Sequence, residues 1–126
     1  RDLVRSRGLG DVYKRQIKRG RRYDAVIMDP PSYGRGPSGE IWKLEKDLFP
    51  FLKLVSGVLS DDPLFFIINS YTTGLAPSVL TCLLDSVVTP RFGGGTVSDE
   101  LGLPVTDSGL VLPCGATGRW TREGRA

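Results

Sequence analysis

The pattern of hydrophobic and polar positions predicts that strands and helices alternate over the first two thirds of the chain. One uninterrupted apolar run lies within residues 23–29, and a second covers residues 64–68. Continuous runs of this length are typical of strands that are buried on both faces, as in a parallel sheet. Pro30 and Pro31 end the first strand, because proline cannot donate a hydrogen bond to the ladder.

Two amphipathic helices are predicted after these strands. The apolar positions that follow Asp47, the expected helix cap, have the i, i+3, i+4, i+7 spacing of one helix face. A second set follows Pro77, which a helix tolerates in its first turn. The first face consists of Leu48, Phe51, Leu52, Val55, Val58 and Leu59, and the second of Leu80, Leu83, Leu84, Val87 and Val88.

The last third of the chain reads as an antiparallel hairpin. Short apolar runs at residues 101–105 and 109–112 flank a cluster of turn-forming residues at 106–108. Residues 32–46, which are rich in glycine, are expected to form a long loop. A strand–helix–strand–helix order that ends in a hairpin predicts an α/β fold with helices packed on the faces of a sheet.

Composition indicates a single globular domain and removes several kinds of chemistry. The 126 residues are 40% hydrophobic and 25% charged, as in ordinary folded domains. No apolar run approaches the roughly 20 residues that span a bilayer, so we expect no membrane segment. There is no histidine, which excludes Ser-His-Asp and Cys-His catalysis and every zinc site that needs imidazole. Cys82 and Cys114 lie far apart, and we expect reduced thiols in a cytoplasmic protein. A single disulfide between them is the alternative.

The net charge of +3 comes from the first sixteen residues, because 12 basic and 12 acidic residues remain after position 16. RDLVRSRGLGDVYKRQ resembles a string that recurs at the ends of unrelated metagenomic reading frames, where sequencing-adapter DNA has been translated. We therefore treat residues 1–16 as a non-native or disordered segment outside the fold, and residues 17–126 as the domain. The alternative is a genuine, solvated basic arm.

The end of the first strand is the expected position of the chemistry, because ligands of open α/β sheets bind beyond the carboxyl ends of the strands. Asp29 supplies a carboxylate there, followed by Pro30, Pro31 and the ring of Tyr33. The carboxylate and the Pro31 carbonyl suit an amino or amide donor on a planar ring, against which Tyr33 can stack. For Asp-Pro-Pro alone, the alternative is the simple end of a strand.

The run YDAVIMDPPSYG resembles the fourth motif of class I S-adenosylmethionine (SAM)-dependent methyltransferases. Among these, the chain is most similar to large-subunit ribosomal RNA base methyltransferases and their uncharacterised relatives. NSYTTG after the second strand and LVLPCGATGRW near the end belong to the same resemblance, which covers about residues 22–120. It implies the C-terminal half of a Rossmann-like methyltransferase sheet. The glycine-rich cofactor loop and the ribose-binding acid of this family have no counterpart here.

The resemblance implies SAM as the cofactor and an RNA base, in ribosomal RNA, as the substrate. By the same resemblance, Asp29, Pro30, Pro31 and Tyr33 are catalytic residues, and Asp29, Pro30 and Asn69 bind the cofactor. Methyl transfer is an in-line displacement, so the lack of histidine is no obstacle, and no metal is implied. Because the cofactor-binding half is absent, we expect the fragment to be inactive and residues 23–29 to form an unpaired sheet edge. The oligomeric state stays open.

One departure from the family concerns the methylated atom. Members that methylate carbon 5 of cytosine place a nucleophilic cysteine at or near the second strand end, where this chain has Asn69, Ser70 and Tyr71. We expect Cys82 and Cys114 to be small buried apolar residues. Covalent carbon methylation is therefore disfavoured, and methylation of a nitrogen or of another substrate class stays open.

The rival hypothesis is a non-enzymatic nucleotide- or protein-binding α/β module. GRGPSG at residues 34–39 matches G-x-G-x-x-G, but a dinucleotide site needs these glycines in a tight turn that leads directly into a helix. VIMD at residues 26–29 resembles the magnesium-binding strand of P-loop proteins, without a P-loop in the sequence. Arg35, Lys43 and Lys46 flank the expected loop and are candidates for phosphate contact, but the neighbouring acids Glu40, Glu45 and Asp47 favour a solvated mixed surface. Trp42 is either a lid residue or a loop anchor.

Overall fold

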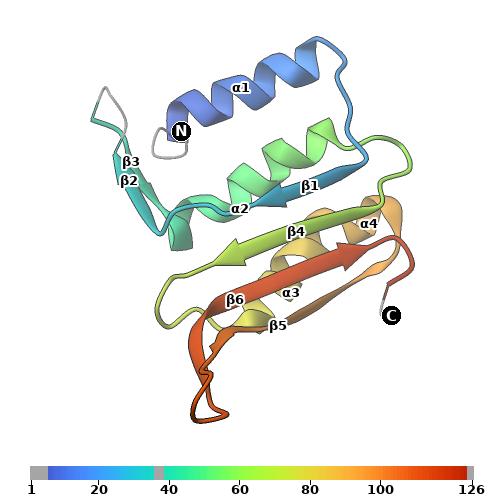
Figure 1. Ribbon diagram of the computed structural model, residues 1–126. Helices are drawn as coiled ribbons and strands as arrows, with labels where there is room; N and C mark the ends of the chain where they lie inside the picture. The colour runs from blue at the N-terminus through green and yellow to red at the C-terminus, as the bar shows by residue number, and fades with distance from the viewer. Residues whose placement is uncertain (1–5, 36–38, 125–126) are drawn as a thin grey trace.

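The computed structural model of the chain (Figure 1) describes residues 6–35 and 39–124, and no side chain before residue 11. Its main element is a four-stranded mixed sheet of order β1-β4-β6-β5, beside a two-stranded sheet of β2 and β3. β1 is parallel to β4, whereas β6 is antiparallel to both β4 and β5. The predicted α/β fold is confirmed. The strands are β1 (Ala25–Met28), β2 (Tyr33–Arg35), β3 (Ile41–Lys43), β4 (Phe65–Ser70), β5 (Gly95–Pro104) and β6 (Val111–Thr121).

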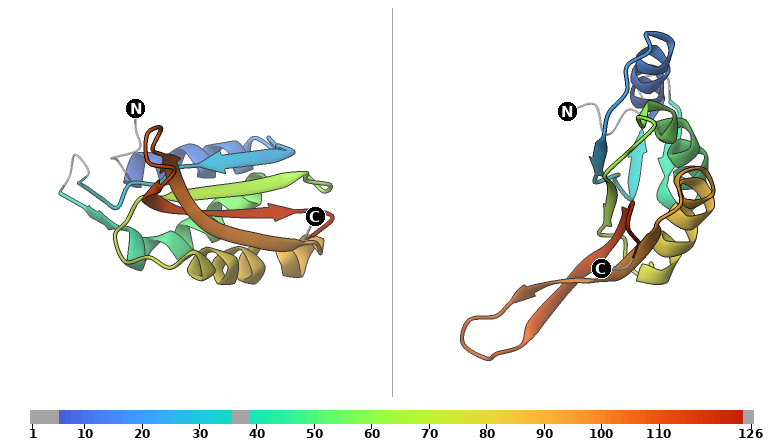
Figure 2. Two further views of the ribbon diagram at one scale, coloured as in Figure 1. Left: turned by 60° about the horizontal axis from the view of Figure 1, so that its bottom comes forward. Right: turned by 90° about the vertical axis from the view of Figure 1, so that its right-hand side faces the viewer.

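The helices cover a single face of the main sheet, as the right-hand view of Figure 2 shows. Both predicted helices are present, and their apolar faces form the core against β4 and β6. The helical segments are α1 (Ser6–Lys18), α2 (Leu44–Val55), η1 (Ser56–Val58), α3 (Pro77–Val87) and α4 (Thr89–Phe92). The core side chains with no exposed surface include Leu52, Val55, Phe66, Ile68, Leu80, Leu84, Val88 and Trp120. No helix among the described residues is long and apolar enough to cross a membrane.

No helix of residues 6–35 and 39–124 covers the opposite face of the sheet, so the prediction of strands buried on both faces is wrong for this part of the chain. Alternate side chains of a strand point to opposite faces. Along β4, Phe66 and Ile68 are buried beneath the helices, whereas Phe65 and Ile67 are only half-buried on the other face. Ile27, the β1 neighbour of Ile67, is 64% exposed. The apolar runs therefore contain two apolar faces, of which the described part of the chain covers one.

β1 forms an edge of the main sheet, in agreement with the expectation of an unpaired edge. The hairpin of β5 and β6 is also confirmed, and its tip extends beyond the sheet (Figure 2). The central position of β6 was not foreseen. Its second half, up to Thr121, lies between β4 and β5 and pairs with both.

Helix α1 overlaps residues 1–16, which the sequence analysis treats as a segment outside the domain. The structure gives Ser6–Lys18 a helical conformation. The ring of Tyr13 meets Phe51 of α2 edge-on, with ring centroids 5.7 Å apart, and Ile17 packs against the same core. Few apolar positions make this contact, so the helical period was not evident from the sequence. The foreign origin of residues 1–16 stays a prediction.

The contact of α1 predicts a loss of stability in alkali. Burial, and secondarily the neighbouring Tyr23, raises the pKa of the Tyr13 phenol above its ordinary value of 10.0. The unfolded chain ionises first, so the contribution of Tyr13 is complete below about pH 10 and is lost as the pH rises through the folded-state pKa. In urea unfolding between about pH 8 and pH 11, Tyr13→Phe should make the decline in unfolding free energy shallower. Tyr71→Phe, which removes an exposed phenol, is the control, and equal slopes for Tyr13→Phe and the parent would contradict the burial of Tyr13.

Candidate functional site

The carboxyl ends of β1 and β4 lie next to each other at one end of the sheet. Met28 and Ile68 are register partners in the parallel pair, so Asp29 and Asn69 occupy the next position of each segment. Asp29 is exposed and Asn69 is half-buried. Asn69 shares the uncovered face with Ile67, because side chains along β4 alternate. Two of the residues predicted for the site are therefore brought together from positions 40 apart in the sequence.

A side-chain hydrogen bond joins the two segments that follow these strands. The hydroxyl oxygens of Ser32 and Thr72 are 2.6 Å apart. The backbone N–H of Thr72 also donates to the hydroxyl oxygen of Ser70, 3.3 Å away, and Ser70 is buried. The Asp-Pro-Pro-Ser turn and the segment after β4 consequently form one continuous rim, which we call the strand-end rim (residues 29–33 and 69–73).

Trp42 anchors the strand-end rim to the core. Its indole Nε1–H donates to the Pro31 carbonyl oxygen at 2.7 Å. The ring is 5% exposed and meets Phe51 edge-on, with centroids 5.4 Å apart. Of the two interpretations of Trp42, the structure supports the loop anchor. The Pro31 carbonyl, expected to face a ligand, uses one lone pair within the fold and keeps the second for a ligand.

The segment expected as a long loop, residues 32–46, contains a short hairpin instead. β2 pairs with β3, and α2 begins directly after β3 at Leu44, three residues before the expected cap. The Asp47 carboxylate still serves the helix start, because it accepts the backbone N–H of Lys43 at 2.8 Å. Each strand of this hairpin has three residues, so the alternation of apolar and polar side chains is too short to reveal a strand in this glycine-rich segment.

The hairpin also bears on the dinucleotide-binding hypothesis. Gly34 lies within β2, paired with Trp42 of β3, and not in a tight turn that opens a helix. Residues 36–38 of the glycine motif lie outside the described residues. The geometry that a dinucleotide fingerprint requires is therefore not met at Gly34.

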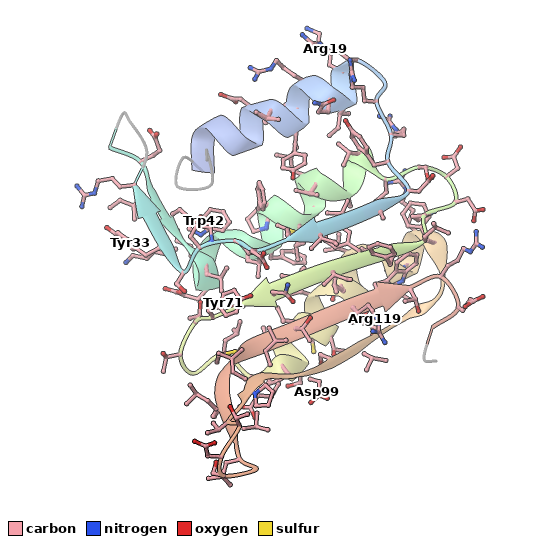
Figure 3. The ribbon with its side chains drawn as sticks, viewed as in Figure 1. Arg19, Tyr33, Trp42, Tyr71, Asp99 and Arg119 are labelled. Atoms are coloured by element: carbon pink, nitrogen blue, oxygen red, sulfur yellow. The ribbon has the colours of Figure 1, made fainter. Side chains whose placement is uncertain are left out.

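The other predicted site residues differ in accessibility. Tyr33 is 52% exposed at the start of β2, and its hydroxyl oxygen accepts a hydrogen bond from Arg35 Nη2 at 3.5 Å. Pro30 is buried and Pro31 is half-buried. Figure 3 shows Tyr33, Trp42 and Tyr71 at the same end of the molecule. Tyr33 is thus available for stacking, and the two prolines form the base of the strand-end rim.

Neither cysteine is the small buried residue that was expected. Cys82 is exposed and Cys114 is half-buried, and both are free thiols. Cys82 falls two positions from both Leu80 and Leu84 on α3, so the helical rotation carries it away from their buried face. Cys114 lies on β6. No group of three or more His, Cys, Asp and Glu side chains that could hold a metal ion occurs in the part of the chain that the structure describes.

A pocket of about 310 Å³ opens beyond the carboxyl end of β4. One wall is the segment of residues 71–75 with Pro77, and the other consists of Glu100 from β5 and residues 113–115 from β6. The sequence analysis did not find Glu100 or Cys114 as site residues. Their position depends on the pairing of β6 with β4, which joins distant parts of the chain and leaves no local signal.

Solved structures resemble this arrangement, although no family model and no curated protein matches the sequence. The SAM-dependent methyltransferase from Agrobacterium tumefaciens matches with a TM-score of 0.80 and 27% identity, over 89% of this chain and 37% of that one. The fold is that of a SAM-dependent methyltransferase. SMU.776, solved with SAH and itself provisionally described as a methyltransferase, matches with a TM-score of 0.56 and 20% identity, over 88% of this chain and 29% of that one.

The comparison confirms the predicted Rossmann-like methyltransferase sheet. The chain spans 37% and 29% of the lengths of the two similar proteins. The uncovered sheet face and the edge position of β1 are features of the described residues.

The anchoring of the strand-end rim by Trp42 can be tested by Trp42→Phe. Phenylalanine keeps an aromatic ring in the core but leaves the Pro31 carbonyl without its donor. We expect the unfolding free energy to fall by at least about 1–3 kcal/mol, the cost of an unsatisfied buried polar group. Urea denaturation measures the loss. Tyr33→Phe, at an exposed ring, is the control and should stay within about 0.5 kcal/mol of the parent; equal losses would contradict the anchoring.

Proposed function

We propose that the chain is the substrate-side part of a SAM-dependent methyltransferase that acts on an RNA base, with ribosomal RNA as the substrate class. The Ser32–Thr72 hydrogen bond carries the proposal, because it joins the Asp-Pro-Pro turn to the end of β4. Ligands of open α/β sheets bind at such strand ends. The 27% identity to a SAM-dependent methyltransferase over 89% of this chain supports the cofactor.

The residues of the strand-end rim fit the amino-acid end of SAM. The exposed Asp29 carboxylate accepts hydrogen bonds from an ammonium group, and the Asn69 amide both donates and accepts. Pro30, which follows Asp29 in the chain, is buried. When bound, SAM supplies an electrophilic methyl group on a sulfonium. The described residues account for one side of such a site, and the rest of the domain has to supply the other.

Positioning is the main task left to the protein in this reaction. An in-line displacement requires the acceptor atom to be held against the methyl group at a fixed distance and angle. The prolines restrict the backbone of the rim, and Trp42 fastens it to the core. The exposed Tyr33 ring offers a stacking face for a planar base at the strand-end rim. A base within a duplex has to be flipped out first.

We propose further that this chain does not catalyse methyl transfer by itself. The glycine-rich loop and the ribose-binding acid of similar methyltransferases have no counterpart in the sequence. The uncovered face with Ile27, Phe65 and Ile67 is assigned to contact with the cofactor-binding half of the domain. β1, at the edge of the sheet, is assigned to pairing with a strand of the same half.

The proposed lack of half of the cofactor site predicts a clear result in SAM-binding experiments. Isothermal titration of SAM into the 126-residue chain should show no saturable binding up to about 1 mM, since half of the ligand's contacts are missing. The protein encoded by the complete gene should bind SAM at micromolar concentrations under the same conditions. Tight and specific binding by the 126-residue chain would contradict the proposed division of the site.

Asp29 is the residue whose replacement tests the proposed function most directly. In the intact protein, Asp29→Ala removes a charge-assisted hydrogen-bond acceptor worth about 1.5–3 kcal/mol. We therefore expect methyl transfer to fall about 10- to 100-fold. The measurement is incorporation of labelled methyl groups into RNA from cells that lack the gene. Asp61→Ala, at an exposed turn outside the strand-end rim, is the matched control. Unchanged incorporation by Asp29→Ala would rule out its assigned role.

A further inference from the structure

None of the residues assigned above to the cofactor lines the pocket beyond β4. It lies between the segment of residues 71–75 and the hairpin of β5 and β6, and its volume is about 310 Å³. Small-ligand pockets have volumes of about 300–1,000 Å³, so this one suits a single planar ring system. It shares Tyr71, Thr72 and Thr73 with the strand-end rim, and the Ser32–Thr72 hydrogen bond connects it to the Asp-Pro-Pro turn.

A β-bulge shapes one wall of the pocket. Leu101 pairs with Gly115 and Gly102 pairs with Pro113, so Cys114 has no partner on β5. An extra residue of this kind bends a strand and redirects its side chains, and bulges are frequent beside binding sites. Here the extra residue, Cys114, lines the pocket together with its neighbours Pro113 and Gly115.

Glycine at position 115 is required by the close approach of β6 to the end of β4. A Cβ atom there would lie 2.3 Å from the Ser70 carbonyl oxygen and 2.9 Å from Cδ1 of Tyr71. Only a residue without a side chain permits this contact. The bulge and the glycine together hold the β6 wall directly against Ser70 and Tyr71.

The lining of the pocket selects for a particular chemistry. Its ten residues include no lysine or arginine, and Glu100 contributes the one formal charge. The Glu100 carboxylate has no hydrogen-bond or ion-pair partner among the described residues. Tyr71, which is 56% exposed, adds an aromatic surface to the pocket lining. Such a lining favours an amino-bearing planar group and disfavours phosphate.

We propose that this pocket binds the acceptor base as a planar ring with an exocyclic amino group. The amino group donates to the Glu100 carboxylate, and the ring lies beside Tyr71. The identity of the ligand rests on the proposed function, but its binding can be measured without methyl transfer.

The two thiols provide the experiment. Cys114 lines the pocket, whereas Cys82 is exposed on α3 and does not line it, so Cys82 is an internal control. The full chain is alkylated with iodoacetamide, and mass spectrometry follows each cysteine in the presence of cytidine, adenosine or uridine. Cytidine and uridine have nearly the same size and differ in the amino group. We expect cytidine or adenosine at millimolar concentration to slow the alkylation of Cys114 at least about threefold, an apparent free-energy effect of about 0.7 kcal/mol or more. Uridine and the Cys82 rate should show no change.

Two variants, each of which replaces a carboxylate by the corresponding amide, test the contact assigned to Glu100. Glu100→Gln should reduce the protection by cytidine or adenosine to the level of uridine. Asp107→Asn, at the exposed turn of the same hairpin, should leave it unchanged. Equal protection by cytidine and uridine, equal protection of both cysteines, or undiminished protection in Glu100→Gln would each overturn the proposal.

The outcome also separates this proposal from the proposed function. If the intact protein transfers no methyl group but Cys114 is protected as described, the pocket is a base-binding site and the methyltransferase proposal fails. If methyl transfer depends on Asp29 but Cys114 is not protected, the acceptor binds elsewhere and this proposal fails.

Discussion

The parallel pairing of β1 with β4 is the constraint on which the rest of the site depends. It is a non-local contact, because Met28 and Ile68 are 40 residues apart, and it brings Asp29 and Asn69 to the same end of the sheet. The Ser32–Thr72 hydrogen bond then closes the rim across the two segments that follow. Without the register of this pair, the acid, the prolines and the amide would be separate turn residues with no common ligand.

The one-sided burial of the sheet explains why its strands are apolar along their whole length. Phe66 and Ile68 pack beneath the helices, but Phe65 and Ile67 lie on a face that no described helix covers. Arg119 lies in the same row of that face, as the β6 neighbour of Ile67, and Figure 3 shows it on the sheet side away from the helices. A charge among aliphatic side chains favours a polar partner over a purely apolar cover.

The features that the sequence predicted are those encoded by neighbouring residues. Helical spacing located α2 and α3 through Leu48, Leu52, Leu80 and Leu84, all of which are buried. The turn cluster at residues 106–108 located the hairpin. Trp42 was ambiguous because its partner, the Pro31 carbonyl, lies beyond the glycine-rich segment. The pocket depends on the register of β6 against β4 and on a bulge at Cys114, and neither leaves a periodic signal.

The distribution of charge is consistent with a division of labour in the proposed binding of RNA. Phosphate contacts position a nucleic acid, whereas contacts to the bases specify it. The pocket has no cation in its lining, so it is suited to a base and not to the backbone. Exposed Arg35 and Lys43 lie on the hairpin of β2 and β3, directly beside the strand-end rim. These side chains are in a position to contact phosphates while the base enters the pocket, whose lining is neutral or acidic. A chain with no net charge after residue 16 can therefore still present a local basic contact.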